Sequence, residues 1–170
     1  AAMAEVRTKL AIWRRPLDIV ILLFYVYFLW SAFFIERHYC EAPLDPNSDD
    51  FILKATYDYA AKYNPLFLQR PEWLRMATCI SCYGLGAGYV VSVIMFALGL
   101  DALRVPVLMF CAFKLYALLI YYSMELWGPV PAPDLPMFFA ADGPYLLGLF
   151  LTLIRLRAAN PFTEAKQKTN

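Results

Sequence analysis

Four stretches of roughly 20 residues or more, almost free of charge, decide what this chain can fold into. These stretches are residues 16–35, 76–100, 105–124 and 135–154. The second has no charged side chain, and the others have one each, namely Asp18, Lys114 and Asp142. A helix that crosses a bilayer needs about 20 mostly apolar residues. The sequence therefore predicts an all-α polytopic membrane protein that forms a single domain. Its four transmembrane helices are expected near residues 16–36, 75–100, 105–126 and 136–157, between polar tails at 1–12 and 158–170.

The charges outside these stretches indicate an orientation. Both ends are basic, with Arg14 and Arg15 before the first stretch and Arg155 and Arg157 after the last, whereas the connection between the first two stretches is mostly acidic. Because basic residues stay on the cytosolic side, we expect both termini in the cytosol or an equivalent compartment. The first stretch is too long and too aromatic for a cleaved signal peptide. The formal net charge of +1 gives no indication of nucleic-acid binding.

The connection between the first and second stretches contains a further helical pattern. Residues 51–63, FILKATYDYAAKY, have apolar and aromatic side chains at helical spacing. This pattern predicts a short amphipathic helix at the membrane surface. Pro65 and Pro71 should end that helix, and Trp73 should mark the point where the chain turns back into the membrane.

Two glycine-containing motifs lie inside the stretches. GLGAG at 84–88 lacks the third glycine of a dinucleotide-binding loop and follows no strand. We therefore interpret Gly84 and Gly88 as sites of close helix packing. Asp142 is followed by a glycine and Pro144, which should kink or locally open the fourth helix.

The cysteines give no indication of a metal or redox centre. Cys79 and Cys82 form a CxxC pair on an apolar helix, and the chain also contains Cys40, Cys111 and a single histidine, His38. A zinc site would require a second pair of ligands. We therefore expect no metal site, and we interpret the cysteines as buried structural thiols, which pack as small apolar side chains.

Two charged residues stand out from the apolar helices. Lys114 lies near the middle of the third helix, where a charge is costly unless it finds a partner, and Asp142 and Glu36 are the available acids. A structural ion pair and a ligand-binding role are both open for Lys114. Glu36 is either a polar residue that ends the first helix or an acid at the mouth of an intramembrane cavity.

The order of these features resembles that of the EXPERA family, and it is most similar to the sigma-2 receptor branch. The resemblance covers roughly residues 16–160 and includes the surface helix, YAAKYNPLFLQRPEW at 59–73, the charge-free second stretch and GPYLL at 143–147. It implies a four-helix bundle whose cavity opens sideways to lipid and takes sterol-like or cationic amphiphilic molecules. Residues 63–75 would then form the roof of the cavity.

The resemblance also implies roles for particular residues. Catalytic family members move a sterol double bond with two acids that donate and accept a proton. Glu36 matches the first acid, but Ser81 stands where the second is expected, so we expect no catalytic residues and leave enzymatic activity open, leaning against it. Ligand contacts are expected from Glu36, Tyr59, Asn64, Ser81, Lys114 and Tyr145. Structural roles are expected for Pro65, Pro71, Trp73, Gly84, Gly88 and Asp142.

Three functions remain open at this stage. The favoured one is a non-catalytic accessory subunit of a larger membrane complex, which could hold a sterol or phospholipid in its cavity. The alternatives are a stand-alone sterol- or lipid-binding protein and a sterol Δ8–Δ7 isomerase. We expect no cofactor, and we expect membrane lipids and other membrane-protein subunits as partners. By the resemblance the compartment would be the endoplasmic reticulum, with the mitochondrial inner membrane as the alternative for a subunit.

The subunit hypothesis makes its own structural predictions. The chain starts at Ala1 instead of Met, which suggests a processed protein. Ordered polar tails would require contacts that a small bundle does not offer, so we expect both tails to touch other chains. These contacts are expected from Arg7, Lys9, Arg14, Phe162, Lys166 and Lys168. The aromatic pairs Tyr25 with Phe28 and Tyr121 with Tyr122 are expected to face neighbouring subunits or lipid.

Overall fold

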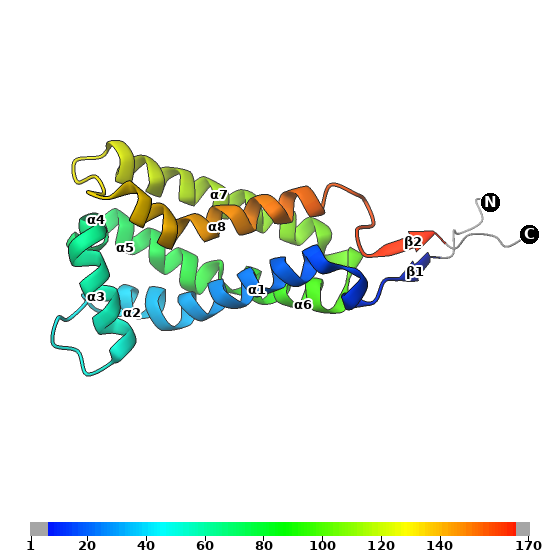
Figure 1. Ribbon diagram of the computed structural model, residues 1–170, viewed down its shortest axis with the longest axis horizontal. Coiled ribbons are helices and arrows are strands. Elements are labelled where there is room, and N and C mark those ends of the chain that lie inside the picture. Colours follow the sequence, from blue (N-terminus) through cyan, green and yellow to red (C-terminus); the bar gives the residue numbers. More distant parts are fainter. Residues whose placement is uncertain (1–6, 166–170) are drawn as a thin grey trace, which may run out of the picture.

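A computed structural model describes residues 7–165, and it confirms the all-α membrane bundle (Figure 1). Three helices are long and apolar enough to cross a membrane, and a bent helix pair makes a fourth span if it acts as one. The first span joins α1 (Pro16–Ser31), the π-helical η2 (Ala32–Glu36) and α2 (Arg37–Glu41). The second joins α5 (Glu72–Cys79), the π-helical η3 (Ile80–Gly84) and α6 (Gly86–Leu98). The third joins η4 (Asp101–Leu103) and α7 (Arg104–Trp127), and the fourth is α8 (Leu135–Arg155).

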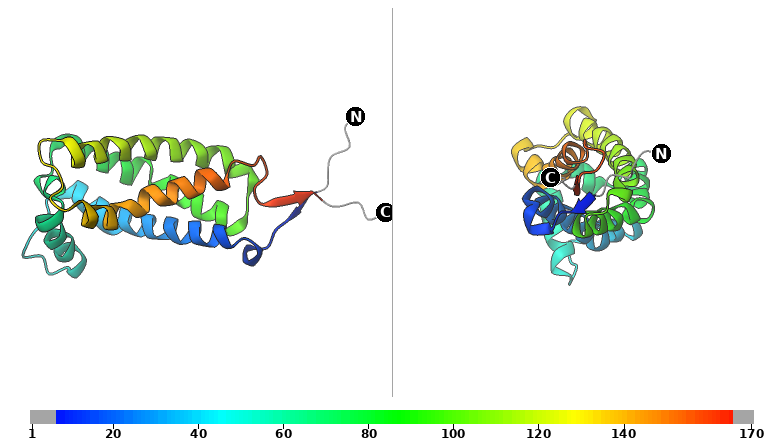
Figure 2. Two further views of the ribbon diagram at one scale, coloured as in Figure 1. Left: turned by 45° about the horizontal axis from the view of Figure 1, so that its top comes forward. Right: turned by 90° about the vertical axis from the view of Figure 1, so that its right-hand side faces the viewer.

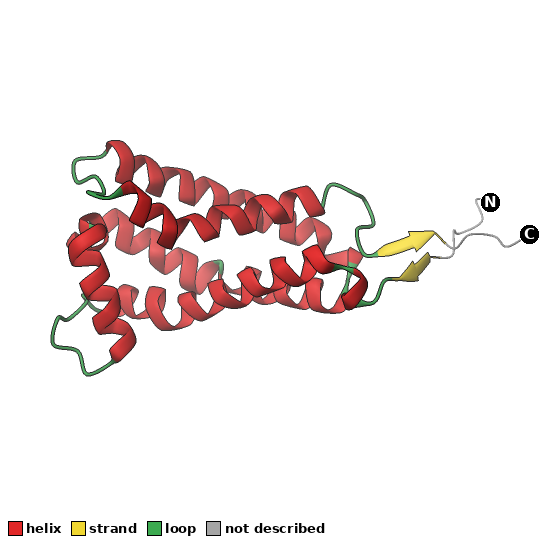
Figure 3. Ribbon diagram, viewed as in Figure 1, coloured by secondary structure: helices red, strands yellow, loops and turns green. Residues whose placement is uncertain are grey.

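The remaining elements lie at the two ends of the bundle, and we name the two halves after them. The roof half is capped by short helices, and the terminal half carries the two short strands (Figure 3). The roof helices are α3 (Phe51–Tyr63) and α4 (Pro65–Gln69). The terminal elements are β1 (Arg7–Lys9), the short helix η1 (Ile12–Arg14) and β2 (Thr163–Ala165).

The first two spans differ from the sequence prediction in length and shape. The first continues to Glu41 instead of ending near residue 36. The second begins at Glu72 and bends by 42° where η3 meets α6. Glycine disfavours helix by about 1 kcal/mol relative to alanine, and Gly84 and Gly86 stand at the bend. Wide π-helical turns interrupt both spans, and η2 and η3 contact each other.

Helix caps explain how the chain forms the roof. The side chain of Asp50 accepts hydrogen bonds from two backbone N–H groups at the start of α3, and that of Asn64 accepts one at the start of α4. As predicted, Pro65 and Pro71 lie outside the surface helix, which ends at Tyr63. Pro65 also begins α4, which the sequence reasoning missed, because proline fits the first position of a helix.

The terminal half is filled by an aromatic core. Tyr25, Phe28, Tyr89 and Phe96 are at most 1% exposed, and their rings lie against one another and against Phe110. The expectation that Tyr25 and Phe28 face lipid or other subunits is therefore wrong. Aromatic rings on an apolar helix carry no sign of which face they occupy, so the sequence could not separate core from lipid contacts.

Glycines allow the helices to approach closely in this half. A Cβ atom on Gly88 would collide with the ring of Phe110, which confirms close packing at this position. Gly84 does not have that role, because the nearest atom to a Cβ there is 3.8 Å away and belongs to its own helical segment. Gly148 is a second site of close packing, since a Cβ atom there would lie 2.8 Å from Phe28 Cζ. Helical glycines pack closely only where a partner helix faces them, which spacing alone does not reveal.

Buried charges close the terminal end of the bundle. Asp18 is fully buried and forms ion pairs with Arg15, which is 4% exposed, and with Arg155 at the end of α8. Both guanidinium groups lie 5.2 Å from the ring centroid of Phe162, which is also fully buried. Because each charge has a partner, the group can remain inside the protein.

The described parts of the two tails bind each other and the bundle. Arg7–Lys9 pairs antiparallel with Thr163–Ala165, and the strands project from the bundle end (Figure 2). Asp101 accepts hydrogen bonds from the Phe162 N–H at 2.9 Å and the Thr163 hydroxyl at 2.7 Å. The assumption that ordered tails require other chains is therefore wrong for these segments. Lys166 and Lys168 lie outside the described residues, and contacts with other proteins stay a prediction.

Candidate functional site

A cavity of about 470 Å³ lies among the four spans in the roof half. This volume falls within the range of small-molecule sites, about 300–1,000 Å³. Its walls are mostly apolar or aromatic side chains with a few polar groups among them, as is typical of such sites. All six residues predicted to contact a ligand line it, namely Glu36, Tyr59, Asn64, Ser81, Lys114 and Tyr145.

A chain of hydrogen bonds crosses one side of the cavity. Lys114 Nζ donates to Ser81 Oγ at 2.6 Å, and Ser81 Oγ donates to Glu36 Oε2 at 2.8 Å. Lys114 is 6% exposed, so the predicted inward direction of its side chain is confirmed. Its direct partner is Ser81 instead of an acid, and the serine connects the ammonium to the carboxylate. A buried charge is compensated in this way without a direct ion pair.

The π-helical turns bring these groups together. Glu36 is the last residue of η2 and Ser81 is the second residue of η3, while Lys114 comes from α7. π-helical turns are rare and often occur at functional sites, because the extra residue in the turn redirects a side chain. Two such turns at one level of two neighbouring spans therefore mark this part of the cavity as specialised.

Asp142 also lines the cavity, although the sequence reasoning gave it only a structural role. Its backbone carbonyl accepts a hydrogen bond from the Tyr122 hydroxyl at 2.7 Å. Among residues 7–165, no group donates a hydrogen bond to its carboxylate. The helix α8 continues through Pro144 without a break. Asp142 is thus a second carboxylate in the cavity lining, in addition to Glu36. The glycine and proline that follow Asp142 in the sequence had suggested a structural role for it instead.

Tyr145 connects the fourth span to the first. Its hydroxyl donates to Ser31 Oγ at 2.6 Å, and its ring stacks on that of Phe28 with centroids 4.5 Å apart. This contact places Tyr145 at the boundary between the packed aromatic core and the cavity. Its position is therefore fixed by protein contacts. Because its hydroxyl is already hydrogen-bonded to Ser31, we expect its ring, and not its hydroxyl, to contact a ligand.

The roof residues have structural partners as well. The Asn64 side chain donates to the Tyr121 hydroxyl and is 3% exposed, so it joins the roof to the third span. The Tyr59 hydroxyl donates a long hydrogen bond, 3.5 Å, to the Met137 carbonyl on α8. Burial, with Asp142 as a nearby negative charge, raises the pKa of the Tyr59 phenol above its usual value. Trp73 lies in the first turn of α5 and is 36% exposed, and its position at the membrane interface stays a prediction.

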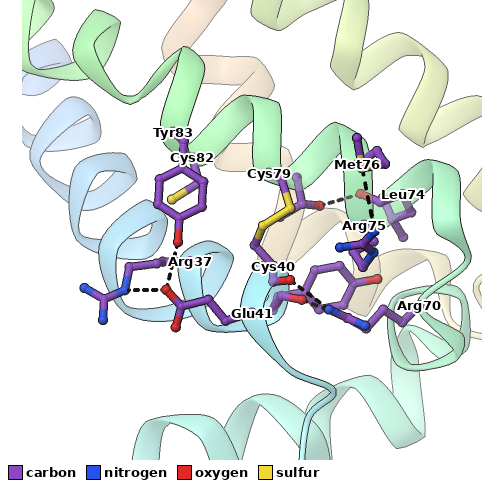
Figure 4. The surroundings of a disulfide bond; sticks show 12 residues. Arg37, Cys40, Glu41, Arg70, Leu74, Arg75, Met76, Cys79, Cys82 and Tyr83 are labelled. Atoms are coloured by element: carbon purple, nitrogen blue, oxygen red, sulfur yellow. Dashed lines mark hydrogen bonds and ion pairs between the residues drawn. A yellow bond between two sulfur atoms is a disulfide. The ribbon is translucent and has the colours of Figure 1, made fainter.

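A disulfide that the sequence reasoning did not predict lies next to the cavity. Cys40 near the end of α2 is bonded to Cys79 at the end of α5, with Cα atoms 5.2 Å apart (Figure 4). The interpretation of these two residues as buried thiols is therefore wrong, whereas Cys82 and Cys111 are free. The CxxC spacing drew attention to Cys82 as the neighbour of Cys79. No local pattern in the sequence pairs Cys79 with Cys40, which lies 39 positions earlier.

Glu125 on α7 is another residue that the sequence reasoning missed. It is fully buried, and neither carboxylate oxygen has a hydrogen-bond partner among the described residues. The Tyr39 hydroxyl is likewise buried without a partner. Glu125 does not line the cavity, and it comes one helical turn after Tyr121, which does. Within residues 7–165, no group of three or more His, Cys, Asp or Glu could hold a metal ion.

Comparison with known proteins does not identify the chain. A scan against protein-family models and searches of curated proteins and of solved structures found no significant match. The geometry of the cavity is therefore the basis for a functional proposal.

Proposed function

We propose that this protein binds an amphiphilic, lipid-like molecule in the cavity between its spans. The observation that carries the proposal is a cavity of about 470 Å³ with mostly apolar walls, one compensated charge pair and one carboxylate without a donor. Mostly apolar walls with a few polar groups are typical of sites that bind such molecules, because the walls offer the hydrocarbon body apolar contacts. The few polar groups would hold the polar head.

Asp142 narrows the class of ligand. An ionised carboxylate in an apolar cavity is costly unless a counter-ion is present. Glu36 already has Lys114 through Ser81, whereas no cation among residues 7–165 is bound to the Asp142 side chain in this way. The amine of a cationic amphiphile would supply one, and a sterol hydroxyl could donate a hydrogen bond to the same carboxylate. We therefore propose sterol-like or cationic amphiphilic ligands, with a phospholipid as the less fitting alternative.

The resemblance to the EXPERA family supports the same proposal. A four-span bundle with a roofed cavity is the arrangement that the resemblance implies, and the six residues it singled out share one cavity. On this basis we propose that the chain is EXPERA-like and acts in the endoplasmic reticulum, with the mitochondrial inner membrane as the alternative. The disulfide at the roof end suits either location, because disulfides persist where the compartment is oxidising.

Photo-crosslinking in lipid nanodiscs tests the proposal. The purified protein would be exposed to a photoreactive cholesterol analogue and a photoreactive dodecylamine analogue, each with and without excess unlabelled compound. We expect saturable labelling of peptides that line the cavity, such as those containing Thr56, Leu74 and Leu118. Labelling that does not saturate, or that is confined to outward-facing residues, would contradict the proposal.

Asp142→Asn separates the two ligand classes. The variant keeps the shape of the side chain but loses the charge, so amine affinity should fall about ten- to a hundredfold, as expected for a charged hydrogen bond. Sterol affinity should change much less. Asp134→Asn is a matched control, because Asp134 caps α8 outside the cavity lining.

A sterol isomerase is the second candidate, and the presence of Asp142 favours it. Isomerisation needs one acid to donate a proton to a ring carbon and a base to remove a proton from another. Glu36 and Asp142 line one cavity and could share these roles although Ser81 is not an acid. Conversion of a Δ8-sterol to the Δ7-sterol, abolished in both Glu36→Gln and Asp142→Asn, would support it. No product from the unmodified protein would exclude it.

The accessory-subunit function has lost one of its arguments. The described parts of the tails pack on their own bundle and do not require another chain. Cross-linking in native membranes decides the matter, because a subunit would form reproducible links to a fixed set of partners. Migration as a monomer or homodimer in mild detergent would argue against this function.

A further inference from the structure

Each cysteine of the disulfide lies close in sequence to one of the hydrogen-bonded polar residues of the cavity. Glu36 precedes Cys40 by one helical turn, and Ser81 follows Cys79 by two residues. The Ser81–Glu36 hydrogen bond and the Cys40–Cys79 bond therefore join the same two segments of the first and second spans. A disulfide in this position fixes the separation of the segments that carry the two cavity residues.

The other side-chain hydrogen bonds near this point, among the described residues, are weaker or more exposed. Cys82 Sγ donates to the Ala32 carbonyl at 3.3 Å, and a thiol is a weak donor. The Tyr83 hydroxyl donates to Glu41 at 2.8 Å, but this pair is exposed at the surface (Figure 4). Arg70 binds the carbonyls of Tyr39 and Cys40, which fastens the end of α2 to the roof instead of to the second span.

The helical geometry explains why a covalent link matters here. Glu36 and Ser81 lie in the π-helical turns η2 and η3, whereas Cys40 and Cys79 lie in the adjoining α-helices α2 and α5. π-helical turns are far less common than α-helical ones. A return of either turn to α-helical bonding would rotate Glu36 or Ser81 about its helix axis. The 2.8 Å hydrogen bond between them would then be lost, and Ser81 would no longer connect Lys114 to the carboxylate.

We propose that the Cys40–Cys79 disulfide is a positioning clamp for the cavity. It holds η2 and η3 in register so that Glu36, Ser81 and Lys114 stay connected, and its reduction lowers the affinity of the cavity for its ligand. The statement about affinity rests on the proposed function, whereas the statement about register does not. Dithiothreitol opens the clamp by supplying two electrons, so that both cysteines become thiols and the reagent becomes a cyclic disulfide.

The test compares the protein in nanodiscs before and after dithiothreitol with the double variant Cys40→Ser/Cys79→Ser. Peptide mapping without reductant first establishes the disulfide. Hydrogen–deuterium exchange is then measured over residues 32–41 and 76–84, and binding is measured with the photoreactive cholesterol and dodecylamine analogues. Cys82→Ser is the matched control, because it removes a thiol from the same segment and leaves the disulfide intact.

Opening the clamp should speed exchange in both segments and weaken probe binding about two- to tenfold, the worth of one hydrogen bond. The control should match the unmodified protein in both measurements. Unchanged exchange overturns the clamp whether or not a probe binds. Faster exchange with no probe bound to any form supports the clamp and contradicts the proposed function instead. Faster exchange with unchanged probe affinity overturns the link between clamp and ligand. If the double variant does not fold, dithiothreitol treatment of the folded protein gives the same comparison.

Discussion

The terminal half and the roof half of this bundle are built from the same four spans but are filled in opposite ways. In the terminal half, aromatic rings meet glycines, so that Phe110 lies against Gly88 and Phe28 against Gly148. In the roof half, alanine or serine lines the interior from each of the four spans, and a cavity of about 470 Å³ remains among them. The lesson is that pairing a large residue with a small one closes the space between helices, whereas small residues facing each other leave it open.

The two halves also treat buried charge differently. Asp18 in the terminal half is bound directly by two arginines, and its neighbours are all protein groups. In the roof half a serine separates Glu36 from Lys114, and the Asp142 carboxylate has no donor among residues 7–165. The direct ion pairs of Asp18 use the hydrogen-bonding groups of that cluster within the protein. In the cavity, the Asp142 carboxylate could still accept a hydrogen bond from a ligand.

The largest effect is expected from breaking the buried charge group of the terminal half. Asp18→Ala leaves Arg15, which is 4% exposed, without its acid and removes the ion pair to Arg155. Loss of one partner of a buried pair typically costs about 3–5 kcal/mol, and we expect that loss in the free energy of unfolding measured by detergent titration. Glu72→Ala, which breaks the exposed pair with Arg75, serves as the control and should change little. Equal effects of the two substitutions would contradict the comparison.

Removal of the disulfide should have the next largest effect, this time in the roof half. Disulfides typically stabilise proteins by about 2–4 kcal/mol, mainly by restricting the unfolded chain. We expect about 2 kcal/mol for Cys40→Ser/Cys79→Ser, the lower end of that range, because spans that stay inserted in the bilayer are already restricted when unfolded. The same titration measures it. Cys82→Ser leaves the disulfide intact and should leave stability unchanged. If it lost as much stability as the double variant, the loss would come from replacing a cysteine side chain and not from breaking the bond.

A single methyl group distinguishes packed from open positions along one helix. Gly88→Ala forces the ring of Phe110 to move, and overpacking of this kind costs about 1–3 kcal/mol. Alanine regains about 1 kcal/mol of helix propensity, so a net loss of about 1 kcal/mol is expected in the unfolding titration. Gly86→Ala is the control, since no atom lies within 4 Å of the added carbon. A loss at Gly86 as large as at Gly88 would contradict close packing as the cause.

Much of this fold could be predicted from the sequence, because the features concerned are local or periodic. The four spans follow from stretches with at most one charged residue, and the helix at Phe51–Tyr63 follows from its amphipathic spacing. The sequence predicts the six cavity residues only through a family resemblance, which the comparisons with known proteins do not test. The inward direction of Lys114 followed from physics alone, since a charge within the membrane requires a partner.

What could not be predicted depends on contacts between distant segments. The Cys40–Cys79 bond joins residues 39 positions apart, and nothing near either cysteine signals the other. The inward faces of Tyr25 and Phe28 were missed because lipid and protein core are equally apolar solvents for a ring. The cavity role of Asp142 was missed because the adjacent Gly143 and Pro144 pointed to a structural kink. In each of these cases the missing information was which residues of one helix face another helix, and hydropathy does not contain that information.

The smallest effect on stability is expected where the cavity itself is filled. Ala117 on α7 lines the cavity, and Ala117→Leu adds three carbon atoms to space that no side chain occupies. Because nothing has to move, the free energy of unfolding should stay within about 0.5 kcal/mol of the unmodified protein. Labelling by the cholesterol analogue should nevertheless be lost, since the larger side chain takes the place of the ligand. Ala112→Leu, on the exposed face of the same helix, should change neither quantity. A marked loss of stability in Ala117→Leu would mean that the roof half is packed like the terminal half, and the contrast between the two halves would fail.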